Sequence, residues 1–248
     1  MVKLSDYVID FIESEGVKDI FMLPGGGCIH LVDSLGKSDI NYICNLHEQA
    51  SSICADAYGQ YTNNLGVALV TTGPGGTNAV TGVAGAWLDS TPTLFLSGQV
   101  QQKDMVKDRG VRQIGFQEIN MVEIVKSITK YAVTITDPNT IRYHMEKAVH
   151  LARTGRPGPV WIDIPQDVQS SMIDIDSLEG YDYPEVLDYP DINIEKIVSD
   201  IIEDLNQSER PIILAGNGIR LSQSINDFKE LIDILQIPVL TTWKGIDY

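Results

Sequence analysis

Short runs of consecutive apolar residues alternate with helical segments between residues 20 and 164, and this pattern constrains the fold more than any other feature. A strand that is apolar at every position is buried on both faces, which is typical of a parallel sheet covered by helices. Strands and helices in strict alternation predict βαβ units. We therefore predict an α/β domain with three layers, a parallel sheet between two layers of helices. The expected strands are 20–23, 40–44, 67–71, 93–97, 131–136 and 159–164.

A second α/β pattern begins near residue 192, with helices expected at 194–205 and 224–235 and strands at 211–215 and 238–241. Two strands and two helices cannot close a sheet that is covered on both faces, so we expect an incomplete second domain. Between the two patterns the chain carries Pro, Asp and Tyr without periodicity, as linkers do. The expected organisation is a first domain at 1–168, a linker at 169–191 and the second domain at 192–248.

Composition excludes several classes of function. The net charge is −16, from 18 basic and 34 acidic residues, which argues against a nucleic-acid or anionic-membrane partner because both need a basic surface. No apolar run is long enough for a transmembrane helix, and the amino terminus lacks the apolar core of a signal peptide. The spacings of the cysteines and histidines fit neither a disulfide framework nor a metal site. We expect reduced thiols, no metal ligands in this chain and a cytoplasmic location.

Two glycine turns follow expected strands and precede expected helices, at residues 24–27 and 73–76. This arrangement aims backbone N–H groups and a helix dipole at an anionic or polar ligand. A dinucleotide fingerprint does not fit, because His30 and Asn78 stand where its last glycine is needed. Asn45 also stands where a ribose-binding acid is expected. We reject an NAD site, which leaves another ligand or simply two tight connections.

Glu48 is the strongest candidate for chemistry. It follows the strand at 40–44 and lies in the first turn of the next helix, at the carboxyl end of a strand, where open α/β sheets bind ligands. The sequence predicts that this carboxylate activates a bound organic cofactor. A structural reading stays open beside it, in which Glu48 complements the helix dipole and Asn45 is the N-cap.

Eight motifs in a fixed order resemble the amino-terminal half of thiamine-diphosphate-dependent enzymes, most closely the acetolactate synthase (acetohydroxyacid synthase) large subunit. Each motif alone is weak, whereas the ordered set is specific. The motifs are Leu23-Pro24-Gly25-Gly26, His47-Glu48-Gln49-Ala50, 72–78 (Thr-Gly-Pro-Gly-Gly-Thr-Asn), 88–92 (Leu-Asp-Ser-Thr-Pro), Ser97-Gly98-Gln99-Val100, Phe116-Gln117-Glu118, Ser127-Ile128-Thr129-Lys130 and 155–160 (Gly-Arg-Pro-Gly-Pro-Val).

The resemblance implies a pyrimidine-binding domain followed by the start of the family's central domain. In such enzymes the glutamate matching Glu48 hydrogen-bonds N1′ of the cofactor's aminopyrimidine and assists removal of the thiazolium C2 proton. Phe116 and Gln117 match residues beside the reacting centre and, with Glu48, are the expected catalytic residues. The expected cofactor-binding residues are Pro24, Gly25, Gly26, Glu48, Thr72, Gly73 and Asn78.

The resemblance further implies decarboxylation of a 2-oxo acid, pyruvate, and transfer of the resulting aldehyde unit to an acceptor. The family's Gly-Asp-Gly…Asn motif, which binds Mg²⁺ and the diphosphate, has no counterpart in this sequence. Its ligands are therefore expected outside this chain, in a homodimer or tetramer or in a partner chain that supplies the diphosphate-binding domain.

Two departures from the acetolactate synthase pattern limit these expectations. Leu46 stands where the family has arginine, and Gln166 stands where it has lysine near the substrate entrance and the flavin. FAD binding and the identity of the acceptor are therefore in doubt. The alternatives are a split subunit of another thiamine-diphosphate decarboxylase or carboligase, or a truncated paralogue without catalytic activity.

Overall fold

The computed structural model describes residues 1–107, 109–184 and 192–248, and the chain divides into two compact units, 1–183 and 184–248. The boundaries expected from the sequence, 1–168, 169–191 and 192–248, stay a prediction. Part of the expected linker, 185–191, lies outside the described residues.

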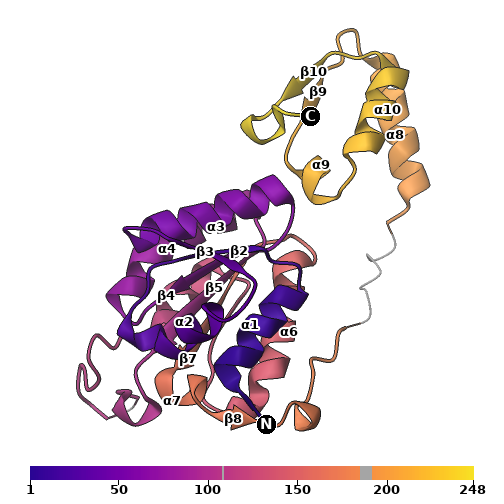
Figure 1. The fold of residues 1–248 in the computed structure, drawn as a ribbon. Coiled ribbons are helices and arrows are strands. Elements are labelled where there is room, and N and C mark those ends of the chain that lie inside the picture. Colours follow the sequence, from indigo (N-terminus) through magenta and orange to yellow (C-terminus); the bar gives the residue numbers. More distant parts are fainter. Residues whose placement is uncertain (108, 185–191) are drawn as a thin grey trace. The chain divides into compact units, whose positions relative to one another are not determined.

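Unit 1 contains a six-stranded sheet in which every neighbouring pair is parallel, in the order β3-β2-β4-β5-β7-β6 (Figure 1). This confirms the predicted parallel α/β fold. The strands are β2 (Asp19–Met22), β3 (Asn41–Cys44), β4 (Gly66–Val70), β5 (Thr93–Gln99), β6 (Tyr131–Thr134) and β7 (Pro159–Pro165).

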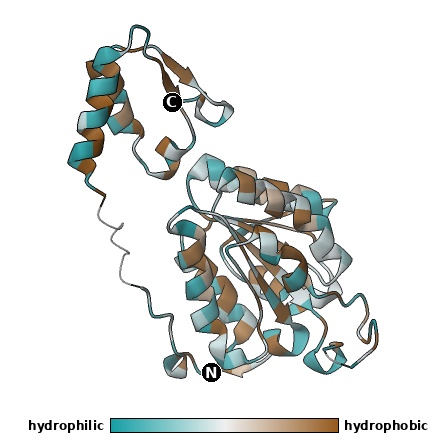
Figure 2. Cartoon of the chain, turned by 180° about the vertical axis from the view of Figure 1, so that it is seen from behind, coloured by the Kyte–Doolittle hydropathy of each residue, from teal (hydrophilic) through white to brown (hydrophobic). Residues whose placement is uncertain are grey.

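Helices cover both faces of this sheet, which confirms the three layers. One apolar cluster joins α1, α2 and α6 to the sheet, and a second cluster on the opposite face joins α3, α4 and α5. Figure 2 shows the apolar strands in brown between helices that alternate brown and teal. The helices are α1 (Leu4–Ser14), α2 (Ile29–Leu35), α3 (Glu48–Thr62), α4 (Pro74–Asp89), α5 (Met121–Val125) and α6 (Ile141–Arg153).

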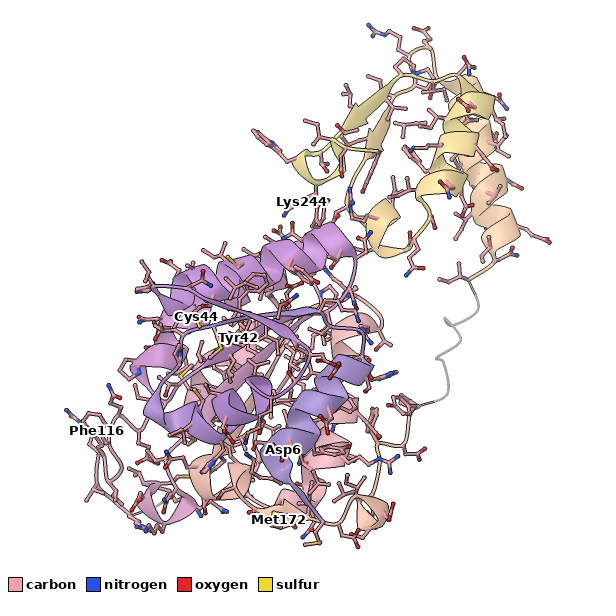
Figure 3. All side chains as sticks on the ribbon, viewed as in Figure 1. Asp6, Tyr42, Cys44, Phe116, Met172 and Lys244 are labelled. Atoms are coloured by element: carbon pink, nitrogen blue, oxygen red, sulfur yellow. The ribbon has the colours of Figure 1, made fainter. Side chains whose placement is uncertain are left out.

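Successive residues of the central strands point to opposite faces of the sheet and enter different apolar clusters. On β4, Val67 and Leu69 enter the α1–α2–α6 cluster, whereas Ala68 and Val70 enter the other cluster. Every residue of β4, β5 and β7 is buried, as their apolar sequences predict. The edge strand β3 is different, because all four of its residues are exposed; Figure 3 labels Tyr42 and Cys44 on it.

The strand order reverses at β2, and this position determines where a ligand site can form. The chain passes from β2 to the edge strand β3 and then returns to β4 on the other side of β2. In open α/β sheets the crevice at such a reversal, outside the carboxyl ends of the strands, is the usual ligand site. The two glycine turns lie there, one after β2 and one after β4.

Short elements near residue 170 were not expected from the sequence, which predicted no regular structure between residues 165 and 191. α7 (Gln166–Gln169) follows β7 directly, and β8 (Met172–Ile173) pairs antiparallel with β1 (Val2–Lys3). A helix of four residues and strands of two are too short to display a hydrophobic period, so the sequence pattern could not reveal them.

Unit 2 follows the second α/β pattern that the sequence predicts. Its two strands, β9 (Ile213–Ala215) and β10 (Val239–Thr241), are parallel. Its helices are α8 (Ile194–Gln207), α9 (Gly218–Leu221) and α10 (Ile225–Leu235). In the described parts of the chain, no helix combines the length and the apolar character that a membrane span requires.

Candidate functional site

Glu48 is the first residue of α3, directly beyond the carboxyl end of β3, as predicted. The N-cap of this helix is His47, whose Nδ1 accepts a hydrogen bond from the Gln49 N–H at 3.1 Å. The expectation that Asn45 caps the helix is wrong, because its side-chain amide instead donates to Ser51 Oγ at 3.1 Å. Glu48 nevertheless lies in the first turn of α3, where a carboxylate complements the helix dipole.

The carboxylate of Glu48 is held between the first turns of α3 and α4. Only 7% of the residue is exposed. Asn78 Nδ2 donates to Glu48 Oε2 at 2.9 Å. A Cβ on Gly75 would lie 3.4 Å from the other oxygen, Oε1, so this oxygen is next to the first turn of α4. The structure thus brings together Glu48 and Asn78, which the sequence predicted as site residues from two separate motifs.

Thr71, at the carboxyl end of β4, joins both glycine turns and was not nominated from the sequence. A Cβ on Gly25 would lie 2.5 Å from Thr71 Cβ, and one on Gly75 would lie 2.7 Å from Thr71 Cγ2. The Gly27 N–H donates to Thr71 Oγ1 at 3.0 Å. Only glycine allows the turns to approach this side chain so closely. Its position directly before the 72–78 motif was the one available sequence signal.

Thr72 points into the protein rather than away from it. Its hydroxyl donates to the Gly98 carbonyl at 3.0 Å, and the residue is 4% exposed. A Cβ on Gly27 would stand 1.9 Å from Thr72 Oγ1. The hydroxyl therefore joins β4 to β5 beneath the first glycine turn, and its predicted contact with a cofactor stays a prediction.

A cavity of about 410 Å³ opens beside these turns, a volume suited to a small molecule. It brings together five of the predicted site residues: Gly25, Gly26, Thr72, Phe116 and Gln117. Glu48, Gly73 and Asn78 do not line it. Pro24 is exposed and outside the cavity. The lining residues are Gly25, Gly26, Gly27, Thr71, Thr72, Val100, Gln101, Asp104, Gly115, Phe116, Gln117 and Gln166.

Phe116 and Gln117 belong to the 100–120 loop, described for residues 100–107 and 109–120. Phe116 is 82% exposed, and Figure 3 labels it on this loop. Gln117 has a φ of +61°, which is unusual for a residue with a side chain. Backbone conformations of this kind occur preferentially where the surrounding structure holds them, often at functional sites.

Helix α7 holds both walls of the cavity. Gln166 Nε2 donates to the Gly26 carbonyl at 2.6 Å, and Gln169 Nε2 donates to the Gly27 carbonyl at 2.7 Å. On the other wall, the Gln102 N–H donates to Asp167 Oδ1 at 3.0 Å. Gln166, which the sequence marked only as a departure from a family pattern, is thus both a lining residue and a support for the first glycine turn.

These residues fit the aminopyrimidine part of thiamine diphosphate. A buried carboxylate can accept a hydrogen bond from a protonated ring nitrogen, and the first glycine turn lines a cavity large enough for a small molecule. No group of three or more His, Cys, Asp or Glu side chains suited to a metal ion occurs in the described ranges.

Two family models match the chain, one in each unit. Residues 2–124 match the N-terminal TPP binding domain of thiamine pyrophosphate enzymes, and residues 198–248 match the central domain of the same enzymes. The chain therefore belongs to the thiamine pyrophosphate (thiamine diphosphate) enzyme family. The resemblance that the sequence motifs indicated is confirmed.

Curated relatives are acetolactate synthases. The chain is 38% identical over 249 residues to the probable acetolactate synthase large subunit of Methanocaldococcus jannaschii, an alignment that covers 98% of this chain and 41% of the relative. It is 38% identical to the acetolactate synthase large subunit of Lactococcus lactis, with 98% and 41% covered. It is 34% identical to the chloroplastic acetolactate synthase 1 of Nicotiana tabacum, with 98% and 36% covered. The chain thus spans about two fifths of the length of these relatives.

Proposed function

We propose that the chain provides the pyrimidine-binding part of a thiamine-diphosphate-dependent enzyme that decarboxylates pyruvate and joins the aldehyde unit to an acceptor, in the manner of an acetolactate synthase. The observation that carries this proposal is the buried Glu48 carboxylate, bonded to Asn78 and placed beside Gly75 at the start of α3. The names of the curated relatives support the same activity.

The role of Glu48 is to share a proton with N1′ of the aminopyrimidine. Asn78 occupies Oε2 as a hydrogen-bond donor, which orients the carboxylate and leaves Oε1 on the side of Gly75. Burial strengthens such a hydrogen bond because water does not compete for it. When bound, thiamine diphosphate supplies a nucleophilic carbon and an electron sink for the loss of CO₂.

The cavity residues define the space beside the first glycine turn. Gly25, Gly26 and the turn that contains Gly73 allow the cofactor to approach the backbone, and Phe116 and Gln117 contact the 2-oxo acid or the acceptor. Among the described residues that line the cavity, Asp104 is the one with a charged side chain. The substrate carboxylate is therefore expected to find its positive partner elsewhere in the assembled enzyme.

Assembly completes the site in this proposal. Mg²⁺ and the diphosphate are bound by a diphosphate-binding domain from outside the 248 residues of this sequence, in a homodimer, a homotetramer or a partner chain. FAD is left out of the proposal because Gln166 replaces the family's lysine. The free thiols of Cys28, Cys44 and Cys54 agree with the reducing cytoplasm in which we place the enzyme.

The decisive experiment measures hydrogen–deuterium exchange at C2 of thiamine diphosphate in the assembled enzyme. Glu48→Gln removes the proton-sharing carboxylate and keeps the size and the hydrogen bond to Asn78, so exchange should fall by at least about a hundredfold. The matched control is Glu123→Gln, also in the first turn of a helix but exposed and paired with Lys126.

Wild-type exchange rates in Glu48→Gln would refute the role of Glu48. An assembled wild-type protein that neither exchanges the C2 proton nor consumes pyruvate would support the alternative of a non-catalytic paralogue. A product other than acetolactate would favour another decarboxylase or carboligase of the family.

A further inference from the structure

A buried polar cluster on the α3–α4–α5 face of the sheet has no part in the site described so far. The register of β5, β7 and β6 places Ser97, Asp163 and Thr134 side by side on three neighbouring strands. Asp163 is 1% exposed. Two residues earlier on the same strands, the rings of Phe95 and Trp161 stack with their centroids 5.6 Å apart. A carboxylate among apolar side chains is costly to bury unless donors surround it.

Three donors surround the Asp163 carboxylate. Ser97 Oγ donates to Oδ1 at 2.5 Å, while Gln99 Nε2 and Thr134 Oγ1 donate to Oδ2 at 3.1 and 3.2 Å. Trp161 Nε1 in turn donates to Ser97 Oγ at 2.8 Å. Burial nonetheless raises the pKa of Asp163 to about 6, so the group is mainly an acceptor at neutral pH.

Gln99 connects this cluster to the 100–120 loop at both of its ends. Its Oε1 accepts from the Val100 N–H at 3.0 Å, where the loop leaves β5. Its Nε2 donates to Asp163 and also to the Ile119 carbonyl at 2.9 Å, where the loop returns. The side-chain amide, 1% exposed, therefore clamps the two ends of one loop.

Asp163 and the Ile119 carbonyl together determine which way this amide faces. An ionised carboxylate only accepts hydrogen bonds, so the amide must present its NH₂ group to Asp163. In that orientation the second N–H reaches Ile119, and Oε1 faces the Val100 N–H. Turned by half a rotation, the amide would place oxygen against the carboxylate and lose all three interactions.

We propose that Asp163 is a positioning residue that acts through Gln99 on the 100–120 loop and thereby sets the place of Phe116 and Gln117 beside the cavity. The loop supplies six of the lining residues, from Val100 to Gln117. The inference rests on the proposed function only where it assigns Phe116 and Gln117 to the reacting centre.

Limited trypsin digestion of the chain tests the positioning without cofactor or activity. The loop carries exposed tryptic sites at Lys107, Arg109 and Arg112, and cleavage after the exposed Lys126 in the same unit is the internal reference. Gln99→Met and Asp163→Leu should each raise cleavage within the loop by at least about fivefold, because the population of the opened loop increases.

Two further variants separate positioning from general loosening of the core. Asp163→Asn retains an oxygen that can accept from Gln99 Nε2, so it should restore near wild-type cleavage. Thr134→Val removes another donor to the same carboxylate, without a link to the loop, and should leave loop cleavage unchanged. Unchanged cleavage in Gln99→Met, or equal increases in Gln99→Met and Thr134→Val, would overturn the proposal.

If Asp163→Leu does not fold, the comparison of Gln99→Met with Thr134→Val still tests the proposal. Hydrogen exchange of the Val100 amide in the wild type is a second test. A Val100 N–H that exchanges as fast as an unprotected amide would contradict the clamp. In the assembled enzyme, Gln99→Met should lower kcat while the affinity for thiamine diphosphate stays within about twofold, since Glu48 and the glycine turns are untouched. A loosened loop with unchanged kcat would refute the catalytic consequence alone.

Discussion

Gly73 and Gln117 meet backbone to backbone: a Cβ on Gly73 would stand 1.9 Å from the carbonyl oxygen of Gln117. Both residues have a φ of +61°. The turn after β4 and the end of the 100–120 loop therefore interlock, and the position of Gln117 depends on the absence of a side chain at residue 73.

Gly73→Ala should destabilise the chain by two effects, a backbone conformation (φ +61°, ψ −112°) that glycine adopts far more readily than alanine, and a collision with Gln117. Gly155→Ala is the matched control, because Gly155 has a φ of +59° but nothing within 4 Å of a new Cβ. The backbone effect alone costs about 1 to 2 kcal/mol, so Gly155→Ala should lower the free energy of unfolding by that amount. Gly73→Ala should cost about 1 to 3 kcal/mol more. Equal losses in urea unfolding would show that the loop moves aside freely.

A double-mutant cycle tests the close approach of both glycine turns to Thr71. Gly75→Ala brings a Cβ to 2.7 Å from Thr71 Cγ2, the atom that Thr71→Ser removes. Thr71→Ser should therefore rescue Gly75→Ala, with a coupling energy of about 1 kcal/mol or more in urea unfolding. It should not rescue Gly25→Ala, whose new Cβ meets Thr71 Cβ at 2.5 Å, an atom that serine keeps. Rescue of both variants, or of neither, would contradict the packing around Thr71.

Asn78→Asp places a second carboxylate against Glu48, where the amide now donates at 2.9 Å. Two like charges at this distance cannot both ionise without cost, and the variant should lose about 1 to 2 kcal/mol of unfolding free energy at pH 7. Asn78→Leu removes the donor without adding charge and is the control. Acidification to about pH 4 protonates one carboxyl of the pair in Asn78→Asp, so the deficit of this variant relative to Asn78→Leu should shrink. A deficit independent of pH would mean that residue 78 is too solvated to interact with Glu48.

The sequence predicts the framework of unit 1 well because its central strands are apolar on both faces. It also predicts the place of Glu48, since a polar residue directly after a strand and at the start of a helix has few alternatives. It misses His47 as the N-cap. Histidine accepts a hydrogen bond from a backbone N–H only when its Nδ1 carries no proton and its own backbone is extended, and the sequence shows neither condition. It misses α7, which is stabilised by contacts with Gly26 and Gly27 far away in the sequence.

The other features that the sequence does not predict depend on tertiary contacts. Thr71 gains its importance only when Gly25 and Gly75 converge on it, and neither spacing nor composition indicates that convergence. Asp163 interrupts an apolar strand, which is a sequence signal for a buried polar cluster. The register of β5 and β6 against β7, however, makes Ser97 and Thr134 its partners. A register shift of one residue would move both side chains to the other face of the sheet, away from Asp163.

Asp163 should also produce a characteristic dependence of stability on pH. Burial raises its pKa from 3.8 to about 6 in the folded chain. Between these values the folded state keeps the proton that the unfolded state releases, so the stabilisation is complete below pH 3.8 and is lost as pH rises toward 6. Because one pKa unit corresponds to about 1.4 kcal/mol, this rise in the pKa of Asp163 corresponds to a loss of about 3 kcal/mol in the free energy of unfolding.

Asp163→Asn should remove this loss, because its amide does not titrate. The difference in unfolding free energy between wild type and Asp163→Asn should therefore fall between about pH 4 and 6 and be constant above that range. Asp33→Asn is the control of opposite sign: hydrogen bonds from Lys37 and Lys3 lower the pKa of Asp33 to about 2. Its contribution is lost only as pH falls below 3.8, so its difference curve should be flat from about pH 4 to 6. A flat curve for Asp163→Asn as well would mean that water or a rearranged donor set solvates the Asp163 carboxylate.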